Sequence, residues 1–319
     1  MKMIILLTIL SFGFIMLLNC KDKRSAMEND LFEQIPDSAF RAYCKRFDIN
    51  GDGKLSMAEA KAVKVINLRS DYETAKKSNN HIAFIPLKGT VASLEGIKLF
   101  PNIIRLYCVD NMLTDLDVSG LTKLKELNCL SNEIINLNVD GCTALTTLHC
   151  NGNMMTSLDV SSCTALTGLS CPCYNLTSLN VTGCKALIWI VCSYSQLTEV
   201  DISTCASLKE FVCMSTPLVS LNASGCTSLT SLAFYENKLL SKVDVSGCTA
   251  LEKLTCSDNQ LTDLDISACK KLTRLVLRNC PNPVTVTVWQ GFNTTKPHTN
   301  FEYYDASNSK IITFVEKEI

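Results

Sequence analysis

From residue 101 onward the sequence repeats one short unit nine times, and this repetition limits the possible folds more than any other feature. Equivalent residues are 21 positions apart, with a single step of 22. The leading apolar residues of the units are Leu106, Leu127, Leu148, Leu169, Ile190, Phe211, Leu232, Leu254 and Leu275. A unit this short cannot bury its apolar side alone, so the units must stack on one another and be covered at both ends.

Two further positions of the unit carry recurring residue types. Two residues after the leading apolar residue stand Cys108, Cys129, Cys150, Cys171, Cys192, Cys213, Phe234, Cys256 and Leu277. Three residues later stand Asn111, Asn132, Asn153, Tyr174, Ser195, Thr216, Asn237, Asn259 and Cys280. The rest of each unit reads like the segment from Leu113 to Ser119, followed by a turn. This is the leucine-rich-repeat pattern L-x-x-L-x-L/C-x-x-N-x-L at the short end of its length range.

The pattern predicts a repeat solenoid of the α/β type that is mostly β. We expect each unit to add one short strand to a parallel sheet, with its Leu and Cys side chains inside and the residues between them on a concave surface. The Asn amide should turn the chain and bond to backbone groups of neighbouring units. Nine strands at the usual spacing would make a curved, rigid platform about 40 Å long.

The chain divides into six predicted segments. Residues 69–100 hold a degenerate repeat around Leu94, Gly96 and Ile97, and in 281–319 alternating Val and Thr at 284–288 indicate a strand. The segments are a signal peptide at 1–19, a lipoprotein linker at 20–30, a helix-loop-helix at 31–68, an N-terminal cap at 69–100, the repeats at 101–280 and a β-rich C-terminal cap at 281–319.

The first twenty residues have the pattern of an export signal. Lys2 precedes an apolar run from Ile4 to Leu18, which is short for a membrane span and typical of a signal-peptide core. The run stops at Cys20, as in the bacterial lipoprotein box, where this cysteine is acylated. Asn19 stands where a small residue is usual before that cysteine. The alternatives are therefore an ordinary secretory signal and an uncleaved anchor. All three interpretations predict that the rest of the chain is exported.

Residues 48–59 match the twelve-residue EF-hand calcium loop at each diagnostic position. The predicted ligands are Asp48, Asn50, Asp52, the carbonyl of Lys54, Ser56 and Glu59. Apolar residues at 40, 43, 44 and 47 predict an amphipathic entering helix, and Ser56 with Glu59 predicts a capping box that opens the exit helix. The alternative is an acidic turn without an ion. Because the chain has one such loop, we expect a structural Ca²⁺ and no cooperative switch.

Cysteine is the unusual residue of the composition, with 18 copies. Seven lie at the strand position, and seven more form a second column in the turn: Cys142, Cys163, Cys184, Cys205, Cys226, Cys248 and Cys269. A buried free cysteine behaves as a small hydrophobe, which explains why Phe234 and Leu277 can replace it. The alternatives are disulfides between neighbouring units and, less favoured, zinc. The Cys171-Pro172-Cys173 segment should point one sulfur inward and the next outward.

The outward positions of the sheet change character along the array. In the early units they are polar or charged: Lys125, Glu126, Asn128, Thr147, His149 and Asn151. In the fifth to seventh units they become Trp189, Val191, Val212, Met214 and Tyr235, and we predict that these five bind a ligand. The alternative is that they pack against a cap or are tolerated surface. His149, without a partner carboxylate, reads as an ordinary surface residue.

Other function classes lack support in the sequence. The net charge is −1 without a polybasic block, so a nucleic-acid partner is not expected. The sequence has no Gly-x-Ser-x-Gly, His-Glu-x-x-His or phosphate-cradling loop, so we expect no enzyme. A carboxylate pair assembled only by folding stays open.

Taken together, the export signal ending at Cys20, the loop from Asp48 to Glu59 and the Leu-x-Cys-x-x-Asn repeats resemble leucine-rich-repeat surface lipoproteins of Bacteroides-type bacteria. The resemblance covers nearly the whole chain and implies an internalin-like, calcium-supported binding solenoid on the outer membrane or cell surface. The expected function is noncatalytic recognition of a protein or glycan by a monomer that touches the membrane only through its lipid. The alternatives are a structural envelope protein and a thiol-based metal or redox protein.

Overall fold

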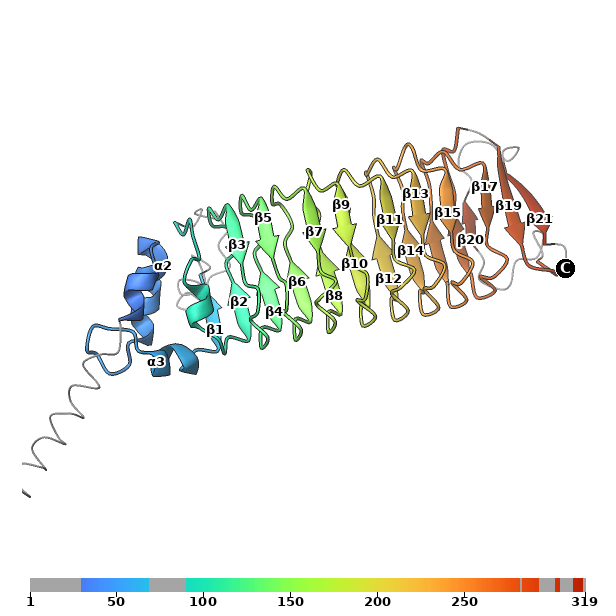
Figure 1. The fold of residues 1–319 in the computed structure, drawn as a ribbon. Helices are drawn as coiled ribbons and strands as arrows, with labels where there is room; N and C mark the ends of the chain where they lie inside the picture. Colours follow the sequence, from blue (N-terminus) through green and yellow to red (C-terminus); the bar gives the residue numbers. More distant parts are fainter. Residues whose placement is uncertain (1–29, 69–89, 282, 293–301, 305–311, 318–319) are drawn as a thin grey trace, which may run out of the picture.

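The computed structural model describes residues 30–68, 90–281, 283–292, 302–304 and 312–317. These residues form one elongated solenoid of about nine turns with few helices (Figure 1). The predicted fold class, a mostly β leucine-rich-repeat solenoid, is confirmed. Residues 1–29 lie outside the described part, and so do Cys20, the signal segment and much of both predicted caps.

One parallel sheet of eleven strands, the main sheet, runs the length of the solenoid. It begins with β1 (Val65–Asn67) and ends with β20 (Glu302–Tyr304). Between them lie β2 (Arg105–Tyr107), β4 (Glu126–Asn128), β6 (Thr147–His149), β8 (Gly168–Ser170), β10 (Trp189–Val191), β12 (Glu210–Val212), β14 (Ser231–Ala233), β16 (Lys253–Thr255) and β18 (Arg274–Val276).

Each unit adds one strand to the main sheet, as expected, and each turn also carries a second short strand that the sequence analysis did not predict. These strands form small parallel sheets on the opposite side, the second side. They are β3 (Asp115–Asp117), β5 (Asn136–Asn138), β7 (Ser157–Asp159), β9 (Ser178–Asn180), β11 (Glu199–Asp201), β13 (Ser220–Asn222), β15 (Lys242–Asp244), β17 (Asp263–Asp265), β19 (Val284–Val288) and β21 (Ile312–Glu316). The cause is the Asp-Leu-Asp alternation, which places Leu116 inside and both carboxylates outside.

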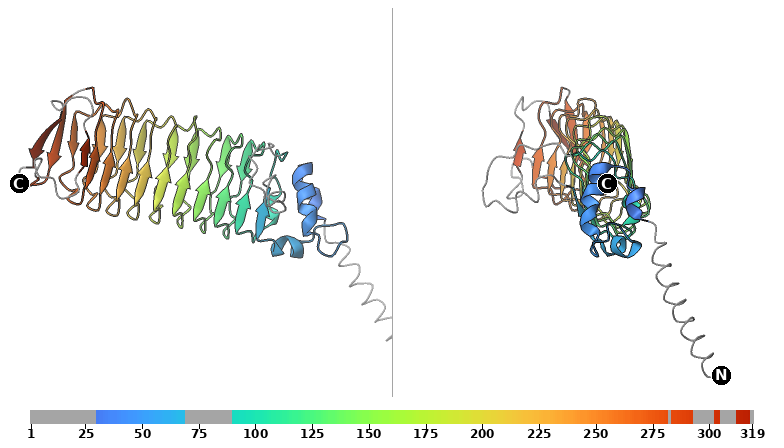
Figure 2. Two further views of the ribbon diagram at one scale, coloured as in Figure 1. Left: turned by 180° about the vertical axis from the view of Figure 1, so that it is seen from behind. Right: turned by 90° about the vertical axis from the view of Figure 1, so that its left-hand side faces the viewer.

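The solenoid runs nearly straight in Figure 1 and in the view from behind in Figure 2. The main sheet is continuous, whereas the second-side strands pair in four separate groups. The right-hand view of Figure 2, along the stack, shows the C-terminal strands displaced to one side of the N-terminal turns.

The core is a stack of identical side chains. Leu106 of β2 pairs with Leu127 of β4, which pairs with Leu148 of β6, and the same register continues along the array. These three leucines are at most 1% exposed. Burial of a leucine side chain contributes about 1.5–3 kcal/mol, so the ladder is a large part of what holds the turns together.

All 17 described cysteines are free thiols and buried, as the hydrophobe interpretation predicted. In the strand column a sulfur faces a carbonyl of the next turn, as Cys129 Sγ does with His149 O at 3.6 Å. In the turn column it faces the preceding turn, as Cys184 Sγ does with Val160 O at 3.1 Å. The thiols therefore fill space between turns and make weak hydrogen bonds to the backbone.

The asparagine column bonds the turns to one another, as predicted. Asn132 Nδ2 donates to the carbonyls of Cys108 at 2.9 Å and Cys129 at 3.0 Å, and Asn132 Oδ1 accepts from Leu113 N at 3.2 Å. Asn153 repeats the pattern one turn later.

The fourth unit departs from our alignment of this column. Cys173, not Tyr174, fills the buried slot, and its Sγ donates to Cys150 O at 3.2 Å. Tyr174 is instead 71% exposed. The expectation that Cys173 points outward was therefore wrong, because the turn through Pro172 delivers both flanking sulfurs to the interior.

The N-terminal helices cover the first turn of the solenoid. They are the 3₁₀ segment η1 (Leu31–Gln34), α2 (Ser38–Cys44), the 3₁₀ segment η2 (Lys45–Phe47), α3 (Met57–Ala62) and, after the gap at 69–89, the 3₁₀ segment η3 (Ile97–Leu99). Phe40 and Phe47 pack their rings against Phe100, and Asp37 both caps α2 and accepts from Ala92 N and Ser93 N. Because β1 follows α3 and pairs with β2, the helix-loop-helix leads straight into the main sheet.

A column of Asp and Asn runs along the second side. Its members are Asp117, Asn138, Asp159, Asn180, Asp201, Asn222, Asp244 and Asp265, and each accepts a hydrogen bond from the backbone N–H two residues ahead. A lysine terminates each end: Lys98 Nζ contacts Asp117 at 2.6 Å, and Lys317 Nζ contacts Asp265 at 2.9 Å. Cations from the two caps thus neutralise the ends of the column.

We expect Asn132→Ala to lower the free energy of unfolding by about 2–4 kcal/mol, because it leaves buried backbone groups of two turns without partners. Urea denaturation followed by circular dichroism measures this loss. The matched control is Asn175→Ala, at an exposed asparagine of the fourth turn. If both variants unfold at the same urea concentration, the asparagine column does not hold the turns together.

Candidate functional site

The five predicted ligand-binding residues lie together on the outer face of the main sheet. Trp189 and Val191 belong to β10 and Val212 to β12, where Val191 and Val212 pair directly. Met214 and Tyr235 follow β12 and β14 in the same column. All five residues are partly buried, with the smaller part of each surface open to solvent. We call these five residues the apolar patch.

Trp189 is set into the sheet by a glycine and a histidine that our sequence analysis did not connect with it. A Cβ atom on Gly168, its partner on β8, would lie 2.3 Å from Trp189 Cζ2, so the indole occupies the space that any other residue would fill. The indole also stacks on His149 of β6, with ring centroids 5.7 Å apart. His149 is therefore a neighbour of the patch. The signal in the sequence is the single Gly in an outward strand position.

Two exposed tyrosines stand beside the patch. Tyr174 and Tyr194 lie in the turns that follow β8 and β10, with ring centroids 6.5 Å apart. Both rings are about half exposed or more, at 71% and 47%. Our alignment had assigned Tyr174 to the buried asparagine column, which hid this pair.

A polar cluster lies on β2 and β4 of the main sheet, separated from the patch by β6 and β8. Tyr107 Oη donates to Glu126 Oε2, and Arg105 Nε donates to Glu126 Oε1 at 3.0 Å. The hydrogen bond from Tyr107, and next the one from Arg105, hold the pKa of Glu126 below its ordinary value. The N-terminal part of the face therefore carries an ionised, hydrogen-bonded carboxylate.

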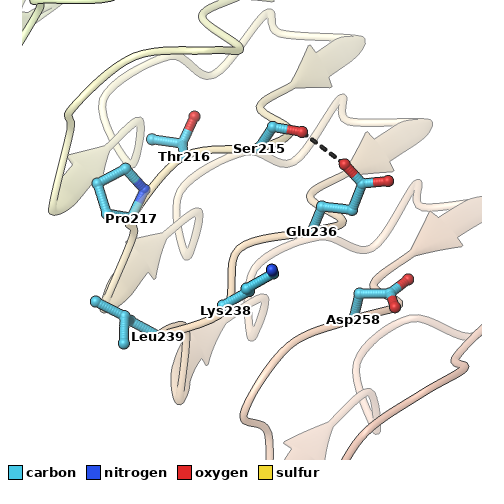
Figure 3. Close-up of a pocket in the computed structure, with 7 residues that line it drawn as sticks. All are labelled: Ser215, Thr216, Pro217, Glu236, Lys238, Leu239 and Asp258. Atoms are coloured by element: carbon cyan, nitrogen blue, oxygen red, sulfur yellow. Dashed lines mark hydrogen bonds between the residues drawn. The ribbon is translucent and has the colours of Figure 1, made fainter.

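A hollow opens at the edge of the main sheet beyond Met214 and Tyr235 (Figure 3). Its volume is about 590 Å³, and the residues that line it come from three successive turns. They are Ser215, Thr216, Pro217, Glu236, Lys238, Leu239 and Asp258. The hollow lies at the unit whose step is 22 residues, where the extra residue makes the segment after Asn237 longer. Our sequence analysis recorded that step without assigning it a role.

The predicted calcium ligands lie in one loop between η2 and α3. Asp48 accepts from Gly51 N and Gly53 N, each at 2.9 Å, and both glycines have the positive φ that the tight turn requires. Glu59 Oε1 accepts from Ile49 N at 2.9 Å. The predicted capping box is confirmed, since Ser56 and Glu59 exchange hydrogen bonds at the start of α3.

The loop has the oxygen chemistry of a calcium site, but its carboxylates are engaged with the backbone. Asp52 accepts from Lys54 N and from Asn50 Nδ2, at 2.9 and 3.1 Å. The hydrogen bond from the Ser56 backbone keeps the pKa of Glu59 below its ordinary value, so that carboxylate is ionised. Within the part of the chain that the structure describes, no group of three or more His, Cys, Asp or Glu side chains is arranged to hold a metal ion.

Burial lowers the reactivity of most described thiols. Cys173 and Cys213 are exceptions, because hydrogen bonds with the Cys150 and Cys192 thiols lower the pKa of each. Burial raises the pKa of Cys44 and Cys129 to about 12. Burial likewise raises the pKa of Cys108 and Cys171 well above the ordinary value. Since the thiolate is the reactive species, these side chains are poor nucleophiles and poor metal ligands near neutral pH.

No helix among the described residues has the length and apolar character needed to cross a membrane.

The comparisons with known proteins find similarity at the level of solved structures. No family model matches the chain, and no curated protein matches it. Among solved structures, the functional domain of InlJ from Listeria monocytogenes, described as including a cysteine ladder, is 18% identical, with 82% of this chain and 81% of that chain covered and a TM-score of 0.30. An internalin (inlF) from the same species is 17% identical, with 82% and 86% covered and a TM-score of 0.44. YopM from Yersinia enterocolitica is 17% identical, with 68% and 51% covered and a TM-score of 0.37.

The assignment of the fold rests on the strand order and register described above.

We expect Gly168→Ala to displace the Trp189 indole, because the new methyl group would overlap the ring. Gly168 has no positive φ, so the backbone itself accepts alanine without strain. The measurement is tryptophan fluorescence, which should shift to longer wavelength as the indole enters water. The chain has two tryptophans, and the second, Trp289, is buried far along the sequence and serves as internal reference.

The matched control is Ser231→Ala, at the same strand position two strands beyond Trp189. An emission spectrum of Gly168→Ala that equals that of the control would mean that the indole does not rest on β8.

Proposed function

We propose that the chain is a noncatalytic binding protein that recognises a protein partner through the outer face of its main sheet. The observation that carries this proposal is the apolar patch. Its side chains lie on an otherwise polar face, supported from below by a rigid sheet. Aromatic residues and Met in the centre with charged residues around them are the usual composition of a protein interface.

The chemistry of the patch favours a protein over a glycan. Sugars stack on aromatic rings, and the Trp189 and His149 rings offer such a surface on one side. The rest of the patch, however, presents Val191, Val212 and Met214, whose flexible or branched aliphatic surface matches apolar side chains of another protein. A glycan ligand is therefore the second candidate, favoured by the ring stack alone.

The cellular setting belongs to the same proposal. The apolar run that ends at Cys20 supports export and acylation of this cysteine, with the solenoid at the outer membrane or cell surface. Attachment through lipid would leave the main-sheet face free for a partner. We propose a monomer, because the units cover one another's apolar sides and both ends of the stack carry caps.

We expect Trp189→Ala to weaken capture of a protein partner at least tenfold and to leave the melting temperature within a few degrees of the parent. The measurement is binding of the purified chain, without residues 1–20, to arrays of cell-surface proteins and of glycans. The matched control is Ile135→Ala, an exposed apolar residue before β5 on the second side, 52% exposed.

Three results would contradict the proposal. They are binding to glycans alone, equal losses in the two variants, and a fall in melting temperature that accounts for the loss in binding. The rival function as a structural envelope protein predicts association of the chain with itself, which light scattering over a range of concentrations detects. The rival thiol chemistry has less support, because the described thiols are buried and their sulfurs point into the core.

We also propose that the loop from Asp48 to Glu59 binds one structural Ca²⁺. Asp48, Asn50, Asp52, Ser56 and Glu59, with the carbonyl of Lys54, supply the hard oxygen ligands that Ca²⁺ prefers. The ionised Glu59 carboxylate and the two left-handed glycines around which the loop is built support this assignment. The helix-loop-helix covers the first turn, so an ion there would stabilise the N-terminal end of the stack.

We expect millimolar Ca²⁺ to raise the melting temperature of the chain by several degrees relative to a chelator, since an ion that binds only the folded state stabilises it. Differential scanning calorimetry with and without Ca²⁺ measures this. Glu59→Gln should abolish the increase, whereas Glu95→Gln, an exposed carboxylate near η3, should keep it. An identical transition with and without Ca²⁺ would remove the calcium site from the proposal.

A further inference from the structure

We propose that the hollow at the seventh unit is an anchor site for a basic side chain, in first place an arginine, of the protein partner. This inference rests on the proposed function, because it places a basic side chain of the same protein partner in the hollow next to the apolar patch. It makes the apolar patch and the hollow two parts of one interface.

The hollow is continuous with the patch along the chain. Met214 is followed by Ser215, and Tyr235 is followed by Glu236, so two patch residues lead directly into its wall. Figure 3 shows Ser215 and Glu236 side by side on successive turns, joined by a hydrogen bond. A partner that covers Met214 and Tyr235 therefore reaches the hollow with the edge of its binding surface.

Two carboxylates give the hollow a negative charge. Glu236 Oε2 accepts from Ser215 Oγ at 2.6 Å, and Asp258 Oδ1 accepts from Asn279 Nδ2 at 3.0 Å. Each carboxylate is thus oriented by a neutral donor and keeps further lone pairs for a ligand. Lys238 lies at the same hollow, yet within the described residues no ion pair joins it to either carboxylate, and the lining has a net charge of −1.

The shape of the hollow fits a long side chain with a charged end. Pro217 and Leu239 line it with apolar surface, and Leu239 is 55% exposed. An arginine can lay its methylene stem on such surface and present its planar guanidinium to carboxylates on adjacent turns.

Other ligands fit the lining less well. A divalent cation would face an ammonium group and two carboxylates, and among the described residues no group of three or more His, Cys, Asp or Glu side chains is arranged to hold a metal ion. A sugar would find no aromatic ring among the lining residues. The combination of an apolar wall and a net negative charge is specific to an amphipathic cation.

The site exists at one place in the array. At the equivalent left-handed turn position the other described units carry Asp110, Ser131, Gly152, Tyr194, Ser215 and Asn279, and only the seventh and eighth carry carboxylates on neighbouring turns. The inserted residue falls between these two units. A repeat with uniform 21-residue steps would have placed neither the hollow nor Leu239 at this edge.

The test is titration of the ¹⁵N-labelled chain with Nα-acetyl-arginine amide, followed by amide chemical shifts. We expect saturable shifts centred on Glu236, Lys238, Leu239 and Asp258. The uncharged isostere Nα-acetyl-citrulline amide at the same concentrations should leave these signals in place. Equal shifts with both compounds, or shifts spread over acidic turns elsewhere in the array, would overturn the proposal.

Variants with opposite expected signs sharpen the test. Glu236→Gln should weaken binding of the arginine probe by up to about fivefold, the change that one exposed ion pair produces, and Lys238→Ala should strengthen it by a similar factor. Asp110→Asn, at the same position of the first unit, is the matched control and should change nothing. Two results would reject the site. They are weaker binding of the arginine probe by Lys238→Ala, and a loss of affinity in the control equal to that in Glu236→Gln.

The failure of this inference is separable from the failure of the proposed function. Trp189→Ala should bind the arginine probe like the parent chain while it loses capture of a protein partner. If the parent chain captures a partner and the probe does not bind, the anchor is wrong and the binding face stands. If the probe binds and no protein is captured, the hollow takes a basic ligand without serving the proposed interface.

Discussion

The structure depends on the in-register stacking of identical turns. A single turn cannot pair its strand backbone or cover its own leucines, so the N–H groups and carbonyls of the strands and the inward apolar side chains find their partners one turn away. Asn132 illustrates the constraint, because one buried amide joins the carbonyls of Cys108 and Cys129 and thereby ties two turns together. Every outward residue is consequently placed in a column at the spacing of the sheet.

Identical residues on successive turns lie next to one another. This stabilises a column of leucines, whereas a column of aspartates suffers charge repulsion, and the second side shows how the repulsion is reduced. Asp and Asn alternate along most of the column, and Asn180 Nδ2 donates to Asp159 at 3.1 Å. The hydrogen bonds from Ser161, and then that from Asn180, hold the pKa of Asp159 below its ordinary value. The two successive aspartates, Asp244 and Asp265, fall where β15 and β17 are not paired, and Lys317 neutralises the second of them.

Both proposed binding features arise where the repeat is interrupted. The asparagine column gives way to Cys173, Ser195 and Thr216 in the fourth to sixth units, and the patch begins there, with Trp189 of the fifth unit resting on Gly168 of the fourth. The hollow lies at the unit that is one residue longer. A regular array supplies rigidity, and its irregular units supply surface that differs from the rest, which is what selective recognition requires.

The sequence by itself determined the solenoid, the length of the turn, the inward leucine and cysteine columns and the grouping of the apolar patch, because these follow from periodicity. It also determined the capping box at Ser56, which follows from local hydrogen bonding. Only the tertiary structure decided that each turn has two strands, that Cys173 takes the asparagine slot, that Trp189 rests on Gly168 against His149, and that one extra residue opens a hollow between Glu236 and Asp258. These features depend on contacts between side chains of different turns. A pattern read along the chain records which residues recur, and the distances between them across turns are set only when the turns pack.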